Sequence, residues 1–533
     1  MITNKYLLLA GALLLAGCQP QEKSAAQAGL IYCSEGALQT FNPQLTNLST
    51  TLDAVSFPLY DRLLEVNPIT LAIEPGLASH WQMSQDGLTY TFTLRKGVMF
   101  HHNANFVPSR PLNADDVVFT FTRLIDTHSP YNPVSGGRYP YFHSLGLDRL
   151  ITSVHRQGEQ VVFTLSRPNA AFLADLASAY AVILSAEYGE QMLRAGTPEQ
   201  LDRQPIGTGP YRLKEYRDRQ FIRYQRHDAY WKGPAHLEQL VFDITPRSAK
   251  RLAKLLTGEC DVMGYPAASQ VKVIQEHDDL ALSVQSGMNV AFLALNTRQP
   301  PFNDVRVRQA LAYAINRENL QQAVYFGTGE VARALLPSLS WGYDPATVLP
   351  SPDLVLARKL LAEAGLGQGF EMTLLLQSGT RPYNPDPRKS AQLIRNDLAA
   401  IGVRVKIQVQ EWSVMQRTLE AGRYDAVLTG WQADNTDPDS FFRQLLGCHA
   451  IAAGSNVSRW CDPGFEQLLD DAVSSAKMGF RIRNYYYAQQ MLTSQMPLIP
   501  LAHALQTQAS RRDVQGLTMT PLGGTLFNGA YRK

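Results

Sequence analysis

The stretch GWQADNTDPD, Gly430 to Asp439, carries a tryptophan and three carboxylates directly after DAVLT, whose apolar pattern is that of a buried strand. Ligand sites of α/β proteins lie at the carboxyl ends of strands, so a carboxylate at this place can pair with a cationic group of a ligand. Asp437 and Asp439 flank Pro438 and have the spacing of turn or cap residues. For Asp434 the pattern leaves two roles open, a ligand contact and an Asx-turn or cap.

Other patterns that could do chemistry are incomplete. GTGP, Gly207 to Pro210, lacks the Lys-Ser/Thr pair of a phosphate loop, and the adjacent His101 and His102 would point to opposite faces of a strand. Neither a Gly-x-Ser-x-Gly elbow nor a His-Glu-x-x-His helix is present. We expect no metal, no cofactor and no enzymatic activity. An exported hydrolase stays open as an alternative, because a Ser/His/Asp triad has no fixed order in a sequence.

The N-terminal segment MITNKYLLLAGALLLAGC has one cation, Lys5, followed by an apolar run that is too short to cross a bilayer as a helix. This is the form of a secretory signal, predicted here for residues 1–17. The LAGC end resembles the lipobox of bacterial lipoproteins, which implies a lipid on Cys18. An ordinary signal with a chance cysteine is the alternative. Residues 18–29 are polar and Ala-rich, typical of a flexible tether.

The resemblance to lipoproteins implies a location as well. Gln19 follows the lipidated cysteine where an Asp would favour retention in the inner membrane, so we expect a periplasmic protein anchored by lipid to the outer membrane of a Gram-negative-type bacterium. With 49 Lys and Arg against 47 Asp and Glu, the near-neutral chain is a poor partner for nucleic acid. Residues 18–533 are too many for one core, and we expect two or three lobes in a monomer.

Five cysteines are informative in an exported chain, because oxidising compartments pair thiols. With Cys18 lipidated, the remaining four allow three connectivities. Cys448 and Cys461 are close in sequence, so we pair them locally, which leaves Cys33 with Cys260. No thiol is then free to act as a nucleophile, and the spacing lacks the CxxC of a metal site.

Helices and strands alternate along the chain. GLIYCSEG, LTYTFTLRKGV and VRVKIQVQ have strand patterns, the last with alternating apolar residues. LNADDVVFTFTRLID is expected to be a helix capped by Asn113, and RKSAQLIRNDLAAIG a helix that leads into VRVKIQVQ. FNDVRVRQALAYAINRENL is expected to be one helix, with an apolar face of Val307, Ala310, Leu311, Ala314 and Ile315. Such alternation predicts α/β construction.

Three segments in order, PGLASHWQMSQDGLTYTFTLRKGVMFH (Pro75 to His101), LNADDVVFTF and IGTGPY, resemble the family-5 extracellular solute-binding proteins. These are receptors of ABC importers for peptides, dipeptides and nickel. EQLDRQPIGTGPYRLKEYRDRQFIRYQRHDAYWKG, LLTGECDVMGYPAASQ and GMNVAFLALNT are most similar to the Sap-type peptide-binding proteins, which are associated with antimicrobial-peptide uptake and resistance. The resemblance runs from about Gly29 to Lys533.

The resemblance implies an α/β fold of two lobes, the periplasmic-binding-protein fold of the large type II class, with an extra subdomain in lobe one. Lobe one would comprise residues 30–287 and lobe two residues 288–503, and residues 504–533 would return to lobe one.

Site residues are implied by position. Asp434 matches the Asp that pairs with the α-ammonium of the ligand in dipeptide binders, and Arg381 in TRPYNPDPR matches the Arg that holds the ligand's carboxylate. Trp431 and Trp412 match rings that flank the ligand, with core packing as the alternative, and Tyr383 and Ser49 complete the candidates. TNLST, residues 46–50, replaces a smaller Gly-containing segment of dipeptide binders, so ligand length stays open.

The resemblance implies a receptor that captures peptides outside the inner membrane and delivers them to a membrane permease. Antimicrobial peptides are one candidate cargo. The alternatives are a receptor of the same fold for haem, a metal chelate or a polyamine, and the exported hydrolase. Asp434 without a functioning Arg381 would favour a cationic amine over a peptide.

Overall fold

A computed structural model describes residues 29–46 and 52–533, so the predictions for Cys18 and Ser49 lie outside the described residues. A mixed sheet of twelve strands runs through the molecule, with β12 and β14 as additional neighbours of β18. In spatial order its strands are β16 (Arg404–Gln410), β15 (Glu371–Gln377), β17 (Ala426–Gln432), β13 (Asn289–Leu295), β18 (Leu498–Arg511), β11 (Val262–Gly264), β1 (Gly29–Ser34), β10 (Gln239–Ile244), β9 (Phe221–Arg226) and β8 (Tyr211–Arg217), and the two additional strands are β12 (Leu280–Ser286) and β14 (Gly329–Val331).

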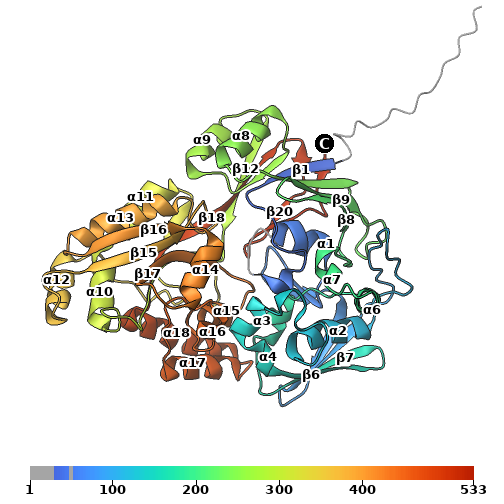
Figure 1. Cartoon of the computed structure of the whole chain (residues 1–533), viewed down its shortest axis with the longest axis horizontal. Coiled ribbons are helices and arrows are strands. Elements are labelled where there is room, and N and C mark those ends of the chain that lie inside the picture. The colour runs from blue at the N-terminus through green and yellow to red at the C-terminus, as the bar shows by residue number, and fades with distance from the viewer. Residues whose placement is uncertain (1–28, 47–51) are drawn as a thin grey trace, which may run out of the picture.

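Strand β18 joins the two halves of this sheet. Its residues 498–504 pair with β13 and β14, whereas residues 505–511 pair with β11 and β12. The chain also crosses between the halves through Gly287 and Met288, which connect β12 to β13. Figure 1 shows β15–β17 on one side of β18 and β1, β8 and β9 on the other. The two halves of the molecule are therefore connected by two adjacent segments.

The two crossing segments are bonded to each other by Asn289. Its side-chain Nδ2 donates to Ala504 O (2.8 Å), and its Oδ1 accepts from Ala504 N (2.8 Å). His503 Nδ1 lies 2.6 Å from Asn289 O and donates to it. Asn289 is buried, and a buried amide whose donor and acceptor are both satisfied adds to specificity as well as stability.

We call the part of the molecule with strands β13 and β15–β17 the second half. Helices surround its strands, and one prediction from the sequence is wrong there. The residues expected to form a single helix form two, α10 (Val305–Ala314) and α11 (Arg317–Tyr325). Ile315 is extended, and the Asn316 side chain accepts from Asn319 N and caps the second helix. Asn favours caps because its side chain replaces a missing backbone acceptor, and this local bond ends the first helix. The expected apolar face is buried.

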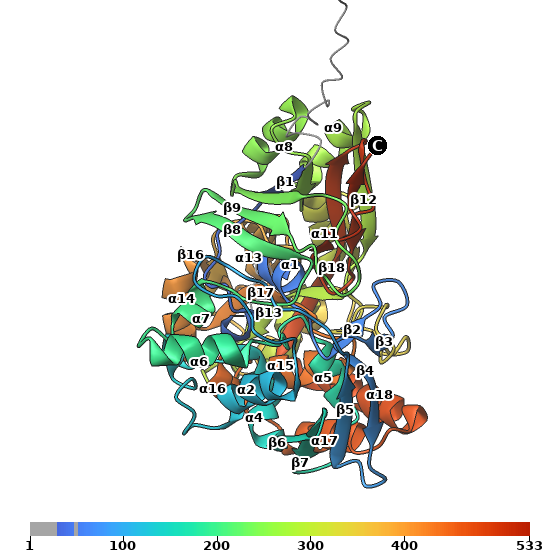
Figure 2. The same ribbon diagram turned by 90° about the vertical axis from the view of Figure 1, so that its right-hand side faces the viewer.

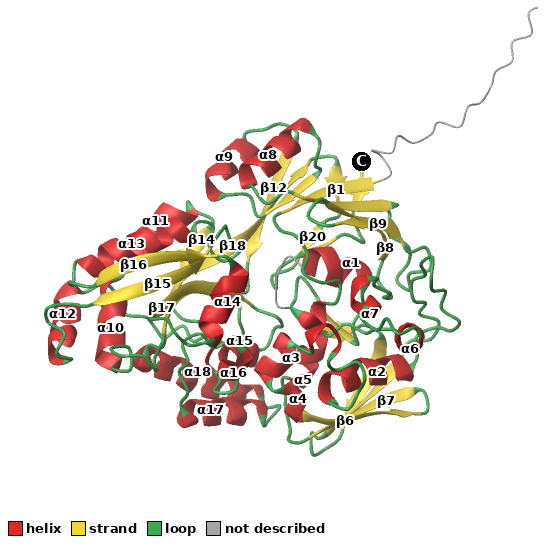
Figure 3. Ribbon diagram, in the orientation of Figure 1, coloured by secondary structure: helices red, strands yellow, loops and turns green. Residues whose placement is uncertain are grey.

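Two further helices of this half lie close to its strands. They are α12 (Leu354–Glu363) and α13 (Pro387–Ala399), and α13 leads into β16 as the sequence predicts. Figure 3 shows these helices alongside the strands of the half-sheet. The buried side chains of this layer form one apolar cluster, which draws on β13, β15, β17 and β18.

The part with strands β1 and β8–β10 is the first half. It carries a separate sheet of four strands, β4 (Ala78–Met83), β5 (Thr89–Leu94), β7 (Gln160–Leu165) and β6 (Ile151–Gln157). Helix α2 (Ala114–Ile125) packs against it, capped by Asn113 as predicted, with Asp116 bonding back to the Asn113 backbone. Figure 2 shows this sheet at the end of the molecule opposite α8 (Ser248–Thr257) and α9 (Val271–Gln275).

The halves also touch away from the crossing segments. Ser144 Oγ donates to Gln444 Oε1 (2.7 Å), and Ala170 N donates to Val473 O (2.7 Å). These contacts join α3 (Pro140–Leu145) and its neighbours to α15 (Pro438–Leu446) and α17 (Pro463–Val473). The space between the halves is therefore bounded by the crossing segments on one side and by these helix contacts on another. In the ranges that the structure describes, no helix is both long enough and apolar enough to cross a membrane.

Two disulfides are formed, Cys33–Cys260 and Cys448–Cys461, which are the pairs expected from the sequence. Their Cα atoms are 5.9 Å and 4.7 Å apart. The first closes a sequence separation of 227 residues and the second one of 13 residues.

Removing each disulfide should destabilise the protein by different amounts, because loop-closure entropy grows with loop length. The model of a constrained unfolded chain gives about 3 kcal/mol for Cys448–Cys461 and about 5 kcal/mol for Cys33–Cys260. We expect the C33A/C260A variant to melt at a lower temperature than C448A/C461A in calorimetry, and both to melt below the wild type. A free thiol at Cys448 in peptide maps of unreduced wild type would contradict the pairing.

Candidate functional site

The position of Asp434 follows from the pairing of two strands. Strand β17 pairs with β13 up to Gln432, opposite Asn289. Ala433 N donates to Met288 O (2.7 Å), and Met288 N donates to Pro521 O (2.7 Å). Asp434 is the next residue, so the strand pairing places it close to the segment that connects the two halves.

The three carboxylates of the GWQADNTDPD stretch differ in their partners. Asp437 caps α15 by accepting from Asp439 N (3.0 Å), and it pairs with Arg481 at 2.8 Å. Asp439 pairs with Arg443 at 2.8 Å. Asp434 has neither role: its Oδ2 accepts from Gln444 Nε2 (2.6 Å), and among the described residues no cation lies within ion-pair distance of it.

Burial makes the unpaired carboxylate unusually basic. Asp434 is 8% exposed, and loss of hydration raises its pKa to about 7, although the hydrogen bond from Gln444 acts in the opposite direction. A charge held without a counter-ion in such surroundings is costly, and an approaching cation would offset that cost. Burial, and then the Asp434 charge, raises the pKa of Tyr180 well above its usual value. The site thus favours a positive group next to Asp434.

Asp434 lies on the wall of a cavity of about 130 Å³, which we call the central cavity. Its wall includes the five sequence candidates that the structure describes: Asp434, Arg381, Tyr383, Trp412 and Trp431. Leu52 and Tyr180 from the first half also contribute, so the central cavity lies between the two halves. The sequence thus selected residues that come together in space, from the segments containing β17, α14 (Trp412–Glu420) and the loop after β15.

Arg381 on this wall has free hydrogen-bonding capacity. Its Nε has no hydrogen-bond partner in the described parts of the chain, and its Nη2 makes one long bond, 3.3 Å, to Ser378 O. Its backbone is fixed by reciprocal bonds with Asn384. The planar guanidinium can therefore donate two hydrogen bonds to a carboxylate.

The aromatic rings of the central cavity are held by close packing. The Tyr383 ring lies directly on the backbone of Gly430, where a Cβ would come within 2.3 Å of the ring. Tyr325 OH donates to Tyr383 O (2.8 Å) and fixes its backbone. The Trp431 indole Nε1 has no hydrogen-bond partner among the described residues. Glycine at 430 is thus explained by the approach of Tyr383, and Trp431 retains a free donor.

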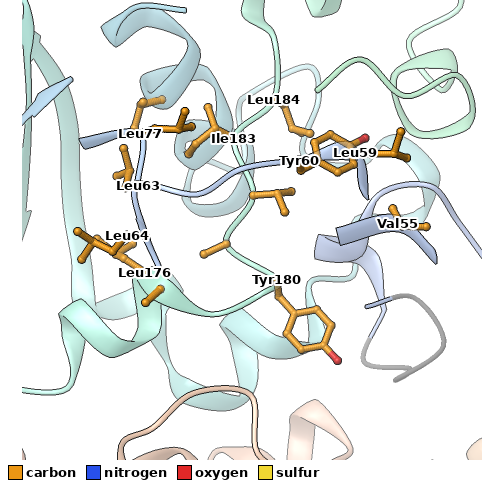
Figure 4. Close-up of a cluster of buried hydrophobic side chains, with 14 of the residues drawn as sticks. Val55, Leu59, Tyr60, Leu63, Leu64, Leu77, Leu176, Tyr180, Ile183 and Leu184 are labelled. Atoms are coloured by element: carbon orange, nitrogen blue, oxygen red, sulfur yellow. The ribbon is translucent and has the colours of Figure 1, made fainter. Parts of the chain in front are cut away.

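A larger cavity of about 280 Å³ adjoins the first, and we call it the adjoining cavity. Leu52, Tyr180 and Asp434 line both cavities. Figure 4 shows that Tyr180 points away from the other side chains of its apolar cluster. The sequence analysis missed Tyr180, because LASAYAVIL is typical of a buried segment, and it missed the adjoining cavity, which is built from several separate loops. Within the described ranges no three His, Cys, Asp or Glu side chains are grouped as metal ligands.

The fold has three features: a sheet in two halves, adjacent segments that cross between them, and a cavity between the halves. Together they define the α/β fold of periplasmic binding proteins. The crystal structure of a dipeptide-binding protein from Pseudoalteromonas sp. SM9913 in complex with Met-Leu has this fold, with a TM-score of 0.91 and 43% identity over 95% of this chain and 100% of that one. Residues 72–453 match the bacterial extracellular solute-binding proteins, family 5, middle region. This chain belongs to that family, whose members are transport receptors without enzymatic activity.

Two curated relatives are similar over nearly their whole length. The probable ABC transporter periplasmic-binding protein SapA of Escherichia coli K12 is 42% identical, over 99% of this chain and 96% of its own. The dipeptide-binding protein of the same organism is 44% identical, over 93% of this chain and 92% of its own.

The titration of Asp434 tests the geometry without any ligand. Carbon-13 NMR of the side-chain carboxyl should give a midpoint near the expected value of about 7. Gln444→Leu should raise this midpoint, because the Gln444 amide stabilises the ionised form. Gln467→Leu, which removes a similar bond to Asp471, is the matched control and should leave the midpoint unchanged. A wild-type midpoint at the ordinary aspartate value would contradict the burial of Asp434.

Proposed function

We propose that this chain is the periplasmic peptide-binding component of an ABC transporter, which captures peptides and delivers them to the permease. The observation that carries the proposal is a pair of opposite charges on one cavity wall: among the described residues, Asp434 has no cation and Arg381 no carboxylate within ion-pair distance. A peptide has an ammonium at one end and a carboxylate at the other. The names of the two Escherichia coli relatives and the peptide bound in the similar crystal structure support the same assignment.

In this proposal Asp434 binds the ammonium, Arg381 binds the terminal carboxylate, and Trp412 and Trp431 contact the rest of the ligand. Termini are common to all peptides, so recognition by these two residues accepts many sequences. Antimicrobial peptides carry the same termini and are a finer ligand class within the proposal. Ser49, outside the described residues, remains a candidate contact.

Lobe closure is part of the proposed mechanism. Residues 30–287 would form lobe one and residues 288–503 lobe two, with residues 504–533 returning to lobe one. Two adjacent connections allow a rotation about one axis, as in hinge closure around a ligand. Cys18 would carry a lipid that keeps the receptor at a membrane, with the outer membrane as the proposed site.

Asp434→Asn should weaken the binding of dialanine, because it leaves a desolvated ammonium without a counter-charge. The expected loss is about 2–5 kcal/mol for a buried charge pair, or roughly 30-fold to several thousand-fold in affinity. N-acetyldialanine should bind wild type with a similar penalty and should barely distinguish wild type from variant, since both changes delete the same interaction. Calorimetry on the four combinations measures this coupling, with Asp278→Asn, an exposed carboxylate, as the control.

The same interaction predicts a pH dependence. The ammonium binds the ionised carboxylate, so affinity should be highest between the Asp434 pKa of about 7 and the ordinary α-amino pKa of about 8, and it should fall as the pH drops below 7. The decline should approach about tenfold per pH unit until the pKa of the complex is reached. Asp434→Asn should abolish this dependence. Equal binding of acetylated and free dialanine to wild type would show that Asp434 does not bind the amine.

Arg381→Met tests the other terminus. Dialanine amide should bind wild type more weakly than dialanine by roughly 30-fold or more, because the amide cannot accept the charge-assisted fork of the guanidinium. The Arg381→Met variant should bind both peptides alike. Arg388→Met, which removes an exposed arginine from the same segment, should keep the wild-type preference. Discrimination that survives in Arg381→Met would assign the terminal carboxylate to another residue, and a preference for free amines over peptides would favour an amine receptor.

A further inference from the structure

The wall of the adjoining cavity carries several charged groups, and most of them are already bonded. Asp61 accepts from Thr208 (2.8 Å), Tyr230 (3.1 Å) and Trp231 (3.0 Å). Glu65 pairs with Lys232, and Glu74 accepts from Asn67 Nδ2 (2.9 Å). These three carboxylates and the lysine are therefore engaged with the protein itself.

Arg62 on the same wall is different. It is 9% exposed, and its Nε and Nη1 are buried without a hydrogen-bond partner in the described residues. Its guanidinium carbon lies 5.6 Å from the centre of the Phe57 ring, another wall residue. A buried donor without an acceptor destabilises the protein, and more so when it is charged. Such a group is expected to have a partner in the functional state.

The backbone around Arg62 is fixed, so the side chain is presented to the cavity by a rigid support. Arg62 forms a bridge with Val182, and its carbonyl accepts from Leu77 N (2.8 Å). The neighbouring Leu63 and Leu64 are fully buried in the apolar cluster of Figure 4. A binding group held by packed neighbours loses little conformational entropy when a ligand arrives.

We propose that the adjoining cavity is a second ligand compartment in which Arg62 binds a carboxylate of the peptide. The inference rests on the proposed function and extends it to specificity. A guanidinium donates charge-assisted hydrogen bonds to a carboxylate, and the unbonded Nε and Nη1 of Arg62, on different edges of the group, can each supply one such donor.

The position of Asp434 indicates which carboxylate this is. Asp434 lines both cavities, and the α-carbon that bears the ammonium also bears the first side chain. With the ammonium on Asp434 and the main chain directed to Arg381 in the central cavity, the first side chain can enter the adjoining cavity. A glutamate at the first position would then bring its carboxylate toward Arg62. A terminal carboxylate of a longer peptide that entered the adjoining cavity instead would offer the same chemistry.

The test compares Glu-Ala with Gln-Ala, which differ in charge but hardly in shape, by calorimetry. Wild type should bind Glu-Ala at least about tenfold more tightly, which is the discrimination of one good charge pair, about 1.4 kcal/mol. Arg62→Met should bind the two alike and still bind dialanine, which shows that it is folded. Arg62→Lys should retain part of the preference, because it keeps the charge and loses the fork. Arg95→Met removes a half-buried arginine of the same half and should keep the full preference.

Trialanine and its amide distinguish the second source. An amide penalty that disappears in Arg62→Met but persists in Arg381→Met would assign the terminal carboxylate to Arg62. Wild type can bind dialanine and yet show no preference for Glu-Ala over Gln-Ala and no preference for trialanine over its amide that depends on Arg62. That result overturns the inference but leaves the proposed function standing. Tighter binding of Lys-Ala than of Glu-Ala also overturns it, because the carboxylates of the wall would then dominate. Failure of wild type to bind any of these peptides overturns the proposed function, and the inference with it.

Discussion

The pair of hydrogen bonds between the Asn289 side chain and the Ala504 backbone is the constraint on which the site depends. It fixes the two segments that connect the halves of the molecule against each other. Met288, one residue earlier, bonds to Ala433 and to Pro521. Through Ala433 the crossing sets the position of Asp434, and through Pro521 it sets one wall of the adjoining cavity. The walls of both cavities are therefore positioned by the same few backbone groups.

That arrangement gives a physical reason for the concentration of acidic residues after β17. Two of the three carboxylates, Asp437 and Asp439, are matched by Arg481 and Arg443, so they stabilise α15 and its attachment. Asp434 accepts its side-chain hydrogen bond, as far as the described residues go, from the neutral amide of Gln444. The neutral partner keeps the carboxylate in place and leaves its charge for a ligand, whereas an arginine would have neutralised it. The same stretch also contacts the first half of the molecule, since Asn435 Nδ2 donates to Asp175 Oδ1 (2.9 Å).

The sequence predicted much of this because local patterns and ordered motifs carry strong information. The strand before Asp434, the Asn113 cap and the helix before β16 follow from patterning. Five dispersed site candidates came from resemblance, not from periodicity. The helix expected through Ile315 failed because a single Asn side chain can end a helix within an otherwise continuous apolar pattern. Arg62 and Tyr180 carried no signal: an arginine after YD and a tyrosine in an apolar run are ordinary until folding brings separate loops together.

Two cavities that share one carboxylate can divide recognition into two kinds. In the proposed function, the groups common to every peptide, its ammonium and its terminal carboxylate, would have partners at Asp434 and Arg381, and such contacts confer affinity without selecting a sequence. Arg62 lines the adjoining cavity, where the variable part of the ligand would lie in the proposed arrangement. Loss of one unsatisfied buried charge there changes selectivity between ligands more than average affinity, because specificity is a difference of affinities. A receptor built in this way can keep broad uptake while one residue on the second wall changes the preferred cargo.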